Sequence, residues 1–337
     1  ELLRREASHL RNRQQSEENR RDFARVLVSH LPFVDRAHYL ELLMEKASAI
    51  VGSNPEDIAS DIAASSSAER MRVGRLLRTV VVKAPEGMGK ARLMSELRRE
   101  VQLADGLVVE GNCWSSGRNT LGPFASIITQ LATALGERSL AVRSFPELIH
   151  LARRDRGHES AASSLAEFLI SAAKERPYVL LLTAVSKAPE DVRQQFDQLS
   201  RAIDHSVAPI LLCATTEPHS KVTPIVQGLS RDQCSEVWSL RPFTLREMQS
   251  VLQGVLGDTP VIRELADMLD KLTGGHPLSF RETLRVLIEE GILVRDTDSW
   301  SLRGASAAAD EYTRAAAAAS QQLEEVKVLK TITIDLG

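Results

Sequence analysis

The stretch Val80–Leu97, VVVKAPEGMGKARLMSEL, decides the fold class of this chain. An apolar run meets a turn containing Gly87 and Gly89, and an amphipathic segment then begins at Lys90. Phosphate-binding loops have this strand–turn–helix order and read G-x-x-x-x-G-K-[ST]. In them backbone N–H groups wrap the phosphates, the lysine neutralises them and the hydroxyl binds magnesium. The stretch therefore predicts a loop descended from a phosphate-binding loop, with Lys90 as its lysine.

Two of the four fixed positions of that motif are altered. The motif falls on Ala84, Gly89, Lys90 and Ala91. Alanine in place of the first glycine is expected to tolerate a positive φ poorly, and Ala91 has no hydroxyl to bind a metal ion. We expect Gly87, Gly89 and Lys90 to contact the phosphates if the loop still holds a nucleotide, and we expect no metal ligand here.

Short aliphatic runs alternate with helical segments after residue 70, which predicts a parallel sheet covered by helices on both faces, an α/β fold. The expected strands are Thr79–Val82, Leu107–Glu110, Tyr178–Leu182, Pro209–Thr215 and Glu236–Leu240.

The strand in RPYVLLLTAVSKAPEDV lacks the acids that hold magnesium and polarise the attacking water in active nucleotidases. The positions that follow its apolar run are Thr183 and Ala184. Glu190 and Asp191 lie seven residues further on, where we expect them in the first turn of the next helix. The metal site is therefore predicted to be lost at both of its ends.

The next strand, in APILLCATTEP, ends in Thr215, Thr216 and Glu217 instead of a basic residue that senses phosphate. Glu217 would repel phosphate. We expect Lys90 to pair with an acid or a backbone carbonyl where phosphate would lie, and Glu217 is the candidate acid.

The composition is that of an ordinary globular protein, with 43% hydrophobic and 26% charged residues. A net charge of −3 gives no basic surface for nucleic acid, so no nucleic-acid partner is expected. The apolar runs are too short for a membrane segment. Cys113, Cys213 and Cys234 are too scattered for disulfides or a zinc site, which favours a cytoplasmic location.

Shifts in composition divide the chain into four predicted parts. They are a helical N-terminal module (residues 1–70), the sheet domain (71–241), a helical lid with a winged-helix-like unit (242–304), and an alanine-rich helix with a terminal strand (305–337). The segment 1–31 includes RNRQQSEENRRD, which is polar on every face. A helix of this kind needs neighbours to persist, so we expect it to dock on another chain or on a second copy.

Three helices are predicted beyond the sheet domain, at Leu245–Leu256, Val261–Leu272 and Pro277–Glu290, followed by a hairpin turn at Asp296–Ser299. In the turn TGGHPLSF, Gly274 and Gly275 end one helix and Pro277 begins the next. His276 in this turn is open to three interpretations: a nucleotide contact, a metal ligand or a turn residue. The structural explanation suffices, because no second ligand lies at a useful spacing.

These segments together resemble the ATPase region of bacterial signal-transduction ATPases with numerous domains, the branch attached to protein kinases, adenylate cyclases and LuxR-type regulators. The segment APEGMGKARLMSELRREVQLADGLVVEGNC is similar to the family's phosphate loop, helix and second strand. RPYVLLL is similar to its Walker B strand, and LTGGHPLSFRETLRVLIEEGILVRDTDSWSL to its G-x-P motif and winged-helix-like unit. The resemblance implies an AAA+-like P-loop fold in which Lys90 contacts phosphate and Pro277 contacts adenine.

The chain departs from this family at the positions that carry catalysis. The Walker A hydroxyl, the Walker B acids and the sensor arginine have no match at Ala91, Thr183–Ala184 and Thr216–Glu217. No Ser/His/Asp or Cys/His arrangement replaces them, so we expect no catalytic residue.

The leading hypothesis is a pseudo-ATPase that acts as a scaffold or interaction module in a bacterial signalling, regulatory or assembly protein. It requires no cofactor, and it binds a protein partner or itself. The alternative is a conformational switch that still binds ATP or ADP, with magnesium, and controls oligomerisation or an attached effector. A transcription regulator is the second alternative, which the low positive charge disfavours.

Overall fold

The computed structural model describes residues 18–29, 31–33, 36–52, 78–114, 121–153, 162–206, 208–218, 235–295 and 299–303. By their contacts these residues form two units, which we describe separately. Those between His38 and Leu240 form the sheet unit, and those outside this range form the helical unit.

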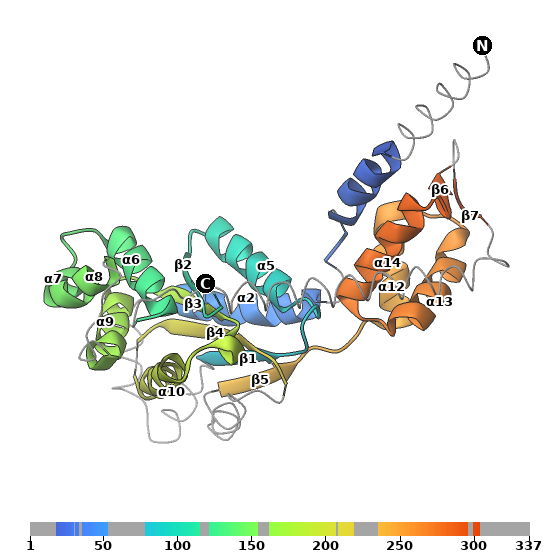
Figure 1. Cartoon of the computed structure of the whole chain (residues 1–337). Helices are drawn as coiled ribbons and strands as arrows, with labels where there is room; N and C mark the ends of the chain where they lie inside the picture. The colour runs from blue at the N-terminus through green and yellow to red at the C-terminus, as the bar shows by residue number, and fades with distance from the viewer. Residues whose placement is uncertain are drawn as a thin grey trace, which may run out of the picture. The chain divides into compact units, whose positions relative to one another are not determined.

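The sheet unit contains five parallel strands, which confirms the predicted α/β fold (Figure 1). Their order across the sheet is β2-β3-β4-β1-β5, so the carboxyl ends of β3, β4 and β1 are neighbours. The strands are β1 (Thr79–Lys83), β2 (Leu107–Asn112), β3 (Tyr178–Thr183), β4 (Ile210–Thr216) and β5 (Ser235–Ser239).

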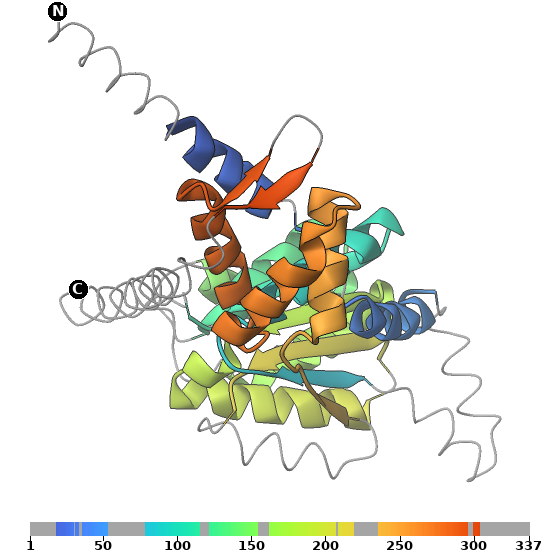
Figure 2. The same cartoon turned by 90° about the vertical axis from the view of Figure 1, so that its right-hand side faces the viewer.

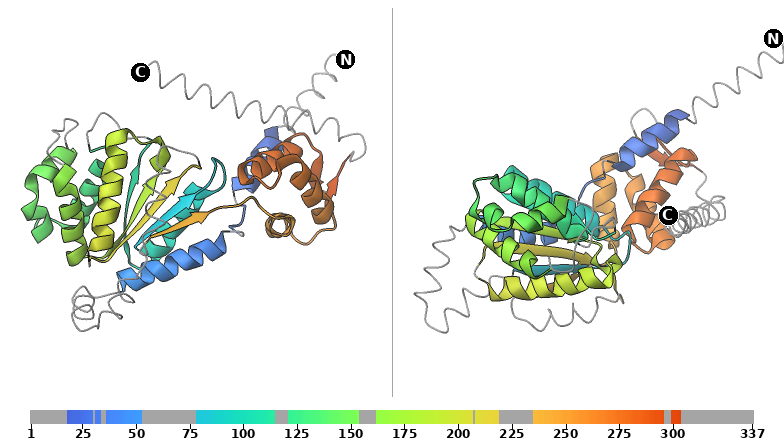
Figure 3. Two further views of the ribbon diagram at one scale, coloured as in Figure 1. Left: turned by 90° about the horizontal axis from the view of Figure 1, so that it is seen from below. Right: turned by 60° about the vertical axis from the view of Figure 1, so that its left-hand side comes forward.

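Helices cover both faces of this sheet, as the sequence predicts, because its central strands are apolar on both sides. Every residue of β4 is buried, and so are all but the last residue of β3. Figure 3 shows α5 (Lys90–Leu103) and α10 (Glu190–His205) on opposite faces. The other helices of this unit are α2 (Ala37–Val51), α6 (Pro123–Leu135), α7 (Leu140–Ser144), α8 (Pro146–Arg153), α9 (Ala162–Glu175) and the short 3₁₀ helix η2 (Val185–Lys187).

The helical unit contains the three predicted helices α12 (Leu245–Leu256), α13 (Val261–Thr273) and α14 (Pro277–Glu289). They are followed by the antiparallel hairpin of β6 (Leu293–Arg295) and β7 (Trp300–Leu302), seen beside α14 in Figure 2. Thr244 begins α12 with a capping box, since its hydroxyl and the Glu247 carboxylate each accept a backbone N–H.

A helix over residues 18–29 corrects one expectation about the N-terminal segment. Ala24, Val28 and Leu31 are buried in the core of the helical unit, and the Phe23 ring stacks on Trp300 with 6.0 Å between ring centroids. This part of the segment is therefore amphipathic, and it packs within its own chain. The apolar residues of FARVLVSHL at positions 24, 28 and 31 give the helical spacing that would have predicted this.

The two described helices of the predicted N-terminal module belong to different units, residues 18–29 to the helical unit and most of α2 to the sheet unit. The division into parts 1–70, 71–241, 242–304 and 305–337 stays a prediction. Cys234 and the alanine-rich segment with its terminal strand lie outside the described residues, as does the part of the N-terminal module after residue 52. None of the described helices combines the length and apolar character needed to span a bilayer.

Candidate phosphate-binding site

The loop between β1 and α5 has the backbone geometry of an anion-binding turn. Gly87 and Gly89 have φ of 79° and 90°, in the left-handed region that glycine adopts without strain. Gly89 is the N-cap of α5, and Lys90 is the first residue of that helix. Left-handed residues within such a turn direct successive backbone N–H groups to one side, and the helix N-terminus adds partial positive charge. The geometry therefore suits a phosphate group.

The expectation that alanine at the first motif position tolerates a positive φ poorly does not come into play in this loop. Ala84 is not among the described residues with a positive φ. Its side chain is buried, and its N–H donates to the Thr216 carbonyl at 3.2 Å. Alanine therefore fits this position as an ordinary continuation of β1 towards β4, and the substitution does not distort the loop.

The structure confirms that Lys90 pairs with backbone carbonyls, one of the two predicted kinds of partner, whereas the candidate acid Glu217 pairs with Lys187. The Lys90 Nζ donates to the Ala84 oxygen at 2.6 Å and to the Pro85 oxygen at 2.7 Å. Burial lowers the pKa of Lys90, while the charges of Glu217 and Glu86 act to raise it. The ammonium is thus folded back onto its own loop, where it has backbone oxygens as partners.

The end of β3 presents no carboxylate. Thr183 is its last residue, and Ala184 follows with φ 57° and ψ 40°, a left-handed conformation that is costly for a residue with a Cβ. The N–H of Ala184 donates to Thr215 Oγ1 at 2.9 Å. Glu190 begins α10 and Asp191 follows it in the first turn, as the sequence predicts, so both acids lie beyond η2.

Lys187 adds a positive charge at this edge of the sheet that sequence reasoning did not identify. Its Nζ lies 3.2 Å from Glu217 Oε1 and 5.3 Å from the centre of the Trp114 ring. The positive charge of Lys187 also lowers the pKa of Lys90, so the two ammonium groups act on each other. A single lysine in the segment SKAPEDV carries no sequence signal, and only the strand order brings it near the loop.

The residues present fit a phosphate group but not its usual magnesium ion. Magnesium bound to a nucleotide takes oxygen ligands from a loop hydroxyl and a strand-end carboxylate. Ala91, Thr183 and Ala184 supply neither a loop hydroxyl nor a carboxylate. In the part of the chain that the structure describes, no group of three or more His, Cys, Asp or Glu residues is arranged to hold a metal ion.

Pro277 belongs to the helical unit, where it occupies the first turn of α14. His276 caps this helix, since its Nδ1 accepts from the Ser279 N–H at 3.3 Å. Gly275 has φ 73°, and a Cβ built on it would lie 2.2 Å from the Phe243 oxygen. Packing therefore explains the glycine and capping explains the histidine, whereas contact of Pro277 with adenine stays a prediction.

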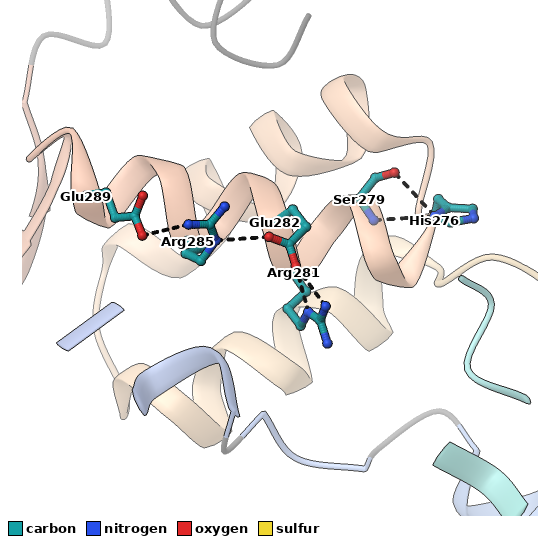
Figure 4. Close-up of polar contacts among 6 residues, drawn as sticks. All are labelled: His276, Ser279, Arg281, Glu282, Arg285 and Glu289. Carbon is teal, nitrogen blue, oxygen red and sulfur yellow. Dashed lines mark hydrogen bonds and ion pairs between the residues drawn. The ribbon is translucent and has the colours of Figure 1, made fainter. Parts of the chain in front are cut away.

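The charged residues along α14 are paired with one another (Figure 4). Arg285 donates to Glu282 at 2.9 Å and to Glu289 at 2.7 Å, and Arg281 donates to Glu282 at 2.7 Å. Burial alone would raise the pKa of Glu282, but hydrogen bonds and charge from the two arginines lower it overall. This helix therefore has its charges mutually neutralised, and they indicate no anion site.

Comparison with known proteins agrees with this fold. Residues 65–212 match the model of the AAA ATPase domain family, and the sheet unit accordingly has an AAA+ ATPase-like fold. No curated protein sequence is significantly similar to the chain.

Among solved structures, the chain is similar to one from the HORMA:CdnC:Trip13 complex of E. coli MS115-1, with a TM-score of 0.48 and 15% identity over 87% of this chain and 90% of that one. It is similar to the Aeropyrum pernix ORC1 protein in complex with DNA, with a TM-score of 0.47 and 17% identity over 89% of this chain and 69% of that one. For Trip13 of Rhizobiales the TM-score is 0.44 and the identity 14%, over 88% and 92% of the two chains. At these values the likeness carries no information on function.

Proposed function

We propose that this chain is a pseudo-ATPase, an AAA+-like module that acts through protein contacts and does not hydrolyse ATP. One observation carries the proposal: the end of β3, where the acids of an active enzyme would stand, consists of Thr183 and a left-handed Ala184. Phosphoryl transfer depends on groups that neutralise charge developing on the transferred phosphate and orient the attacking water. Neither strand-end residue has a carboxylate to hold the magnesium ion or to polarise the attacking water.

The loop side supports the same proposal. Ala91 removes the hydroxyl that would complete the coordination of magnesium. The loss is independent of the loss at β3, because the two positions lie on different elements. Reversion of one of them would therefore leave the metal site incomplete.

Steady-state phosphate release tests the proposal. The purified chain is incubated with millimolar ATP and magnesium, beside Lys90→Ala as the matched control. We expect no release above the control, because Lys90 has no catalytic step to support. Magnesium-dependent release that disappears in Lys90→Ala would overturn the pseudo-ATPase.

A nucleotide-binding switch is the second candidate function, and one observation favours it. Gly87 and Gly89 retain the left-handed geometry of an anion-binding loop although the metal side is lost. In this second candidate function ATP or ADP binds without turnover and shifts an equilibrium between two conformations. The shift is set by the difference between the nucleotide's affinities for the two conformations. Pro277 would contact the adenine, as the family resemblance implies.

The partner is proposed to be another protein or a second copy of the chain, in a bacterial signalling, regulatory or assembly context in the cytoplasm. The polar segment before residue 18 is the proposed contact, since residues 24, 28 and 31 are already buried in the helical unit. Removing residues 1–17 alone should lower the oligomer mass or abolish a pull-down. An unchanged mass and an unchanged set of partners would contradict this role. The absence of a nucleic-acid partner stays a prediction, and so does the disfavoured role as a transcription regulator.

A further inference from the structure

Three neighbouring strand ends bring together the charges at the candidate site. The sheet order β3-β4-β1 places the residues after β4 between those after β3 and those after β1. Glu217 follows β4, Lys187 lies in η2 after β3, and Lys90 follows the β1 loop. The acid is therefore positioned between two lysines at the carboxyl edge of the sheet, where ligands of open parallel sheets bind.

Lys187 is held beside the loop by contacts that it can exchange. Glu217 lies 3.2 Å from its Nζ, with side chains that are 35% exposed for Lys187 and 29% for Glu217. The Trp114 ring, 5.3 Å away, supports the ammonium from another direction. The pair is partly open to solvent, which weakens it, so an incoming anion can compete for Lys187.

Lys90 has partners that a phosphate would replace. Its ammonium is bound to the Ala84 and Pro85 carbonyls, which belong to the loop itself. Charge-assisted hydrogen bonds to phosphate oxygens are stronger than those to neutral carbonyls. Both lysines therefore have hydrogen bonds or ion pairs that can be redirected to one ligand.

We propose that the loop binds the phosphates of a nucleoside di- or triphosphate without a divalent metal ion, with Lys187 providing the positive charge that magnesium provides elsewhere. The inference rests on the nucleotide-binding candidate above. Gly87, Gly89 and the first turn of α5 cradle the phosphates, while Lys90 and Lys187 contact them from two sides.

The balance of charges supports the replacement of magnesium by Lys187. A magnesium ion brings two positive charges, but it is held by acids that offset part of them. In this chain those acids are absent at Thr183–Ala184, and the ammonium of Lys187 is paired with Glu217 at the same edge of the sheet. Glu217 is the acid that opposes the phosphate, and it therefore limits the affinity.

Calorimetric titration with ATP tests the inference, once with magnesium and once with EDTA. We expect affinities that agree within about twofold under the two conditions. Lys187→Met should weaken binding by about tenfold, as expected for loss of one charge-assisted contact, and Lys187→Arg should keep it within about threefold. Glu217→Gln should strengthen binding by about threefold, because it removes a like charge near the phosphates.

Lys174→Met is the matched control. Lys174 lies exposed in the last turn of α9, before β3 begins, and so at the opposite edge of the sheet. The Lys174→Met substitution removes one positive charge, as Lys187→Met does, but ATP binding should not change. Equal melting temperatures of all variants without ATP show that they are folded.

Two results would overturn the inference: no ATP binding in EDTA, whether or not ATP binds with magnesium, or binding that Lys187→Met and Lys174→Met affect equally. Neither of these concerns hydrolysis, so the pseudo-ATPase proposal stands or fails separately in the phosphate-release assay. Absence of binding under both conditions would also reject the switch, while leaving an inactive scaffold.

Discussion

The ends of β1 and β3 differ in how well each matches a site that binds a nucleotide with magnesium. After β1, Gly87 and Gly89 keep their left-handed backbone and Lys90 begins the helix. After β3, neither Thr183 nor Ala184 carries a carboxylate. The phosphate side of the site, Gly87–Lys90, depends on backbone geometry, which β1 and α5 maintain because both contact β4. The metal side, at Ala91 and Thr183–Ala184, depends on two or three side chains. Catalysis can thus be lost while the loop remains shaped for an anion.

Restoring the metal side should produce the largest change, an increase in ATP affinity when magnesium is present. The double variant Ala91→Thr/Thr183→Asp supplies a hydroxyl and a carboxylate at the two altered positions. Magnesium should then tighten ATP binding roughly thirtyfold, about 2 kcal/mol, a magnitude typical of hydrogen bonds and contacts to charged groups. Titrations with magnesium and with EDTA measure it, and each single variant is a control. An unchanged magnesium dependence would mean that these positions do not face the ligand.

Disturbing the phosphate side should change the free energy of unfolding by a slightly smaller amount. Gly89→Ala places a Cβ on a residue with φ 90° and should destabilise the sheet unit by about 1–2 kcal/mol. Ala91→Gly, in the first turn of α5, is the control for a general loosening of the helix start. Urea unfolding reports both. If Gly89→Ala is as stable as the parent chain, the loop does not need its left-handed residue.

Substituting the left-handed residue after β3 should stabilise the sheet unit, in contrast to Gly89→Ala. Ala184→Gly removes the Cβ from a left-handed position and should stabilise the sheet unit by about 1 kcal/mol. Ala188, at the other end of η2, has φ −64°, so Ala188→Gly should destabilise by roughly 0.5–1 kcal/mol. Comparison of the two glycine variants distinguishes the relief of backbone strain from the effect of removing a methyl group. Destabilisation of equal size in both variants would show that Ala184 is not strained.

The smallest expected effect concerns pH. Burial lowers the pKa of Lys90 from 10.5, so between the lowered value and 10.5 the unfolded chain binds more protons than the folded one. Stability relative to Lys90→Met should therefore rise with pH across this interval and stay level below it. Urea midpoints of the two proteins between pH 7 and pH 10.5 give the difference. A relative stability that falls with rising pH would contradict the burial of the ammonium.

The sequence predicted the elements well and the contacts between side chains poorly. The strand beginning at Thr79 and the helix Leu245–Leu256 follow from local apolar patterns, and the structure has both. For Lys90 they allow either an acid or a backbone carbonyl as the partner, and only the structure shows that it is a carbonyl. Glu217 is a plausible partner by strand order, but it pairs with Lys187, whose position depends on the left-handed turn at Ala184. Contacts of this kind require the three-dimensional path of loops.

Ala84 illustrates a second limit. The motif assigns the position to glycine, and the expectation of a strained alanine assumed that its backbone would have a positive φ. In the structure the two left-handed residues of the loop are Gly87 and Gly89. A motif records which residues occur at a position, but it does not record the φ of this particular loop.

Single-turnover hydrolysis is the sharpest test of whether this chain is a pseudo-ATPase, because it needs only one event at each site. The chain, in excess over radiolabelled ATP with magnesium, is followed for several hours beside Lys90→Ala and beside buffer. We expect phosphate to appear at the same rate in all three. Faster release by the parent chain than by Lys90→Ala would show that the site still catalyses hydrolysis, and it would contradict the loss of the metal side as the defining change in this protein.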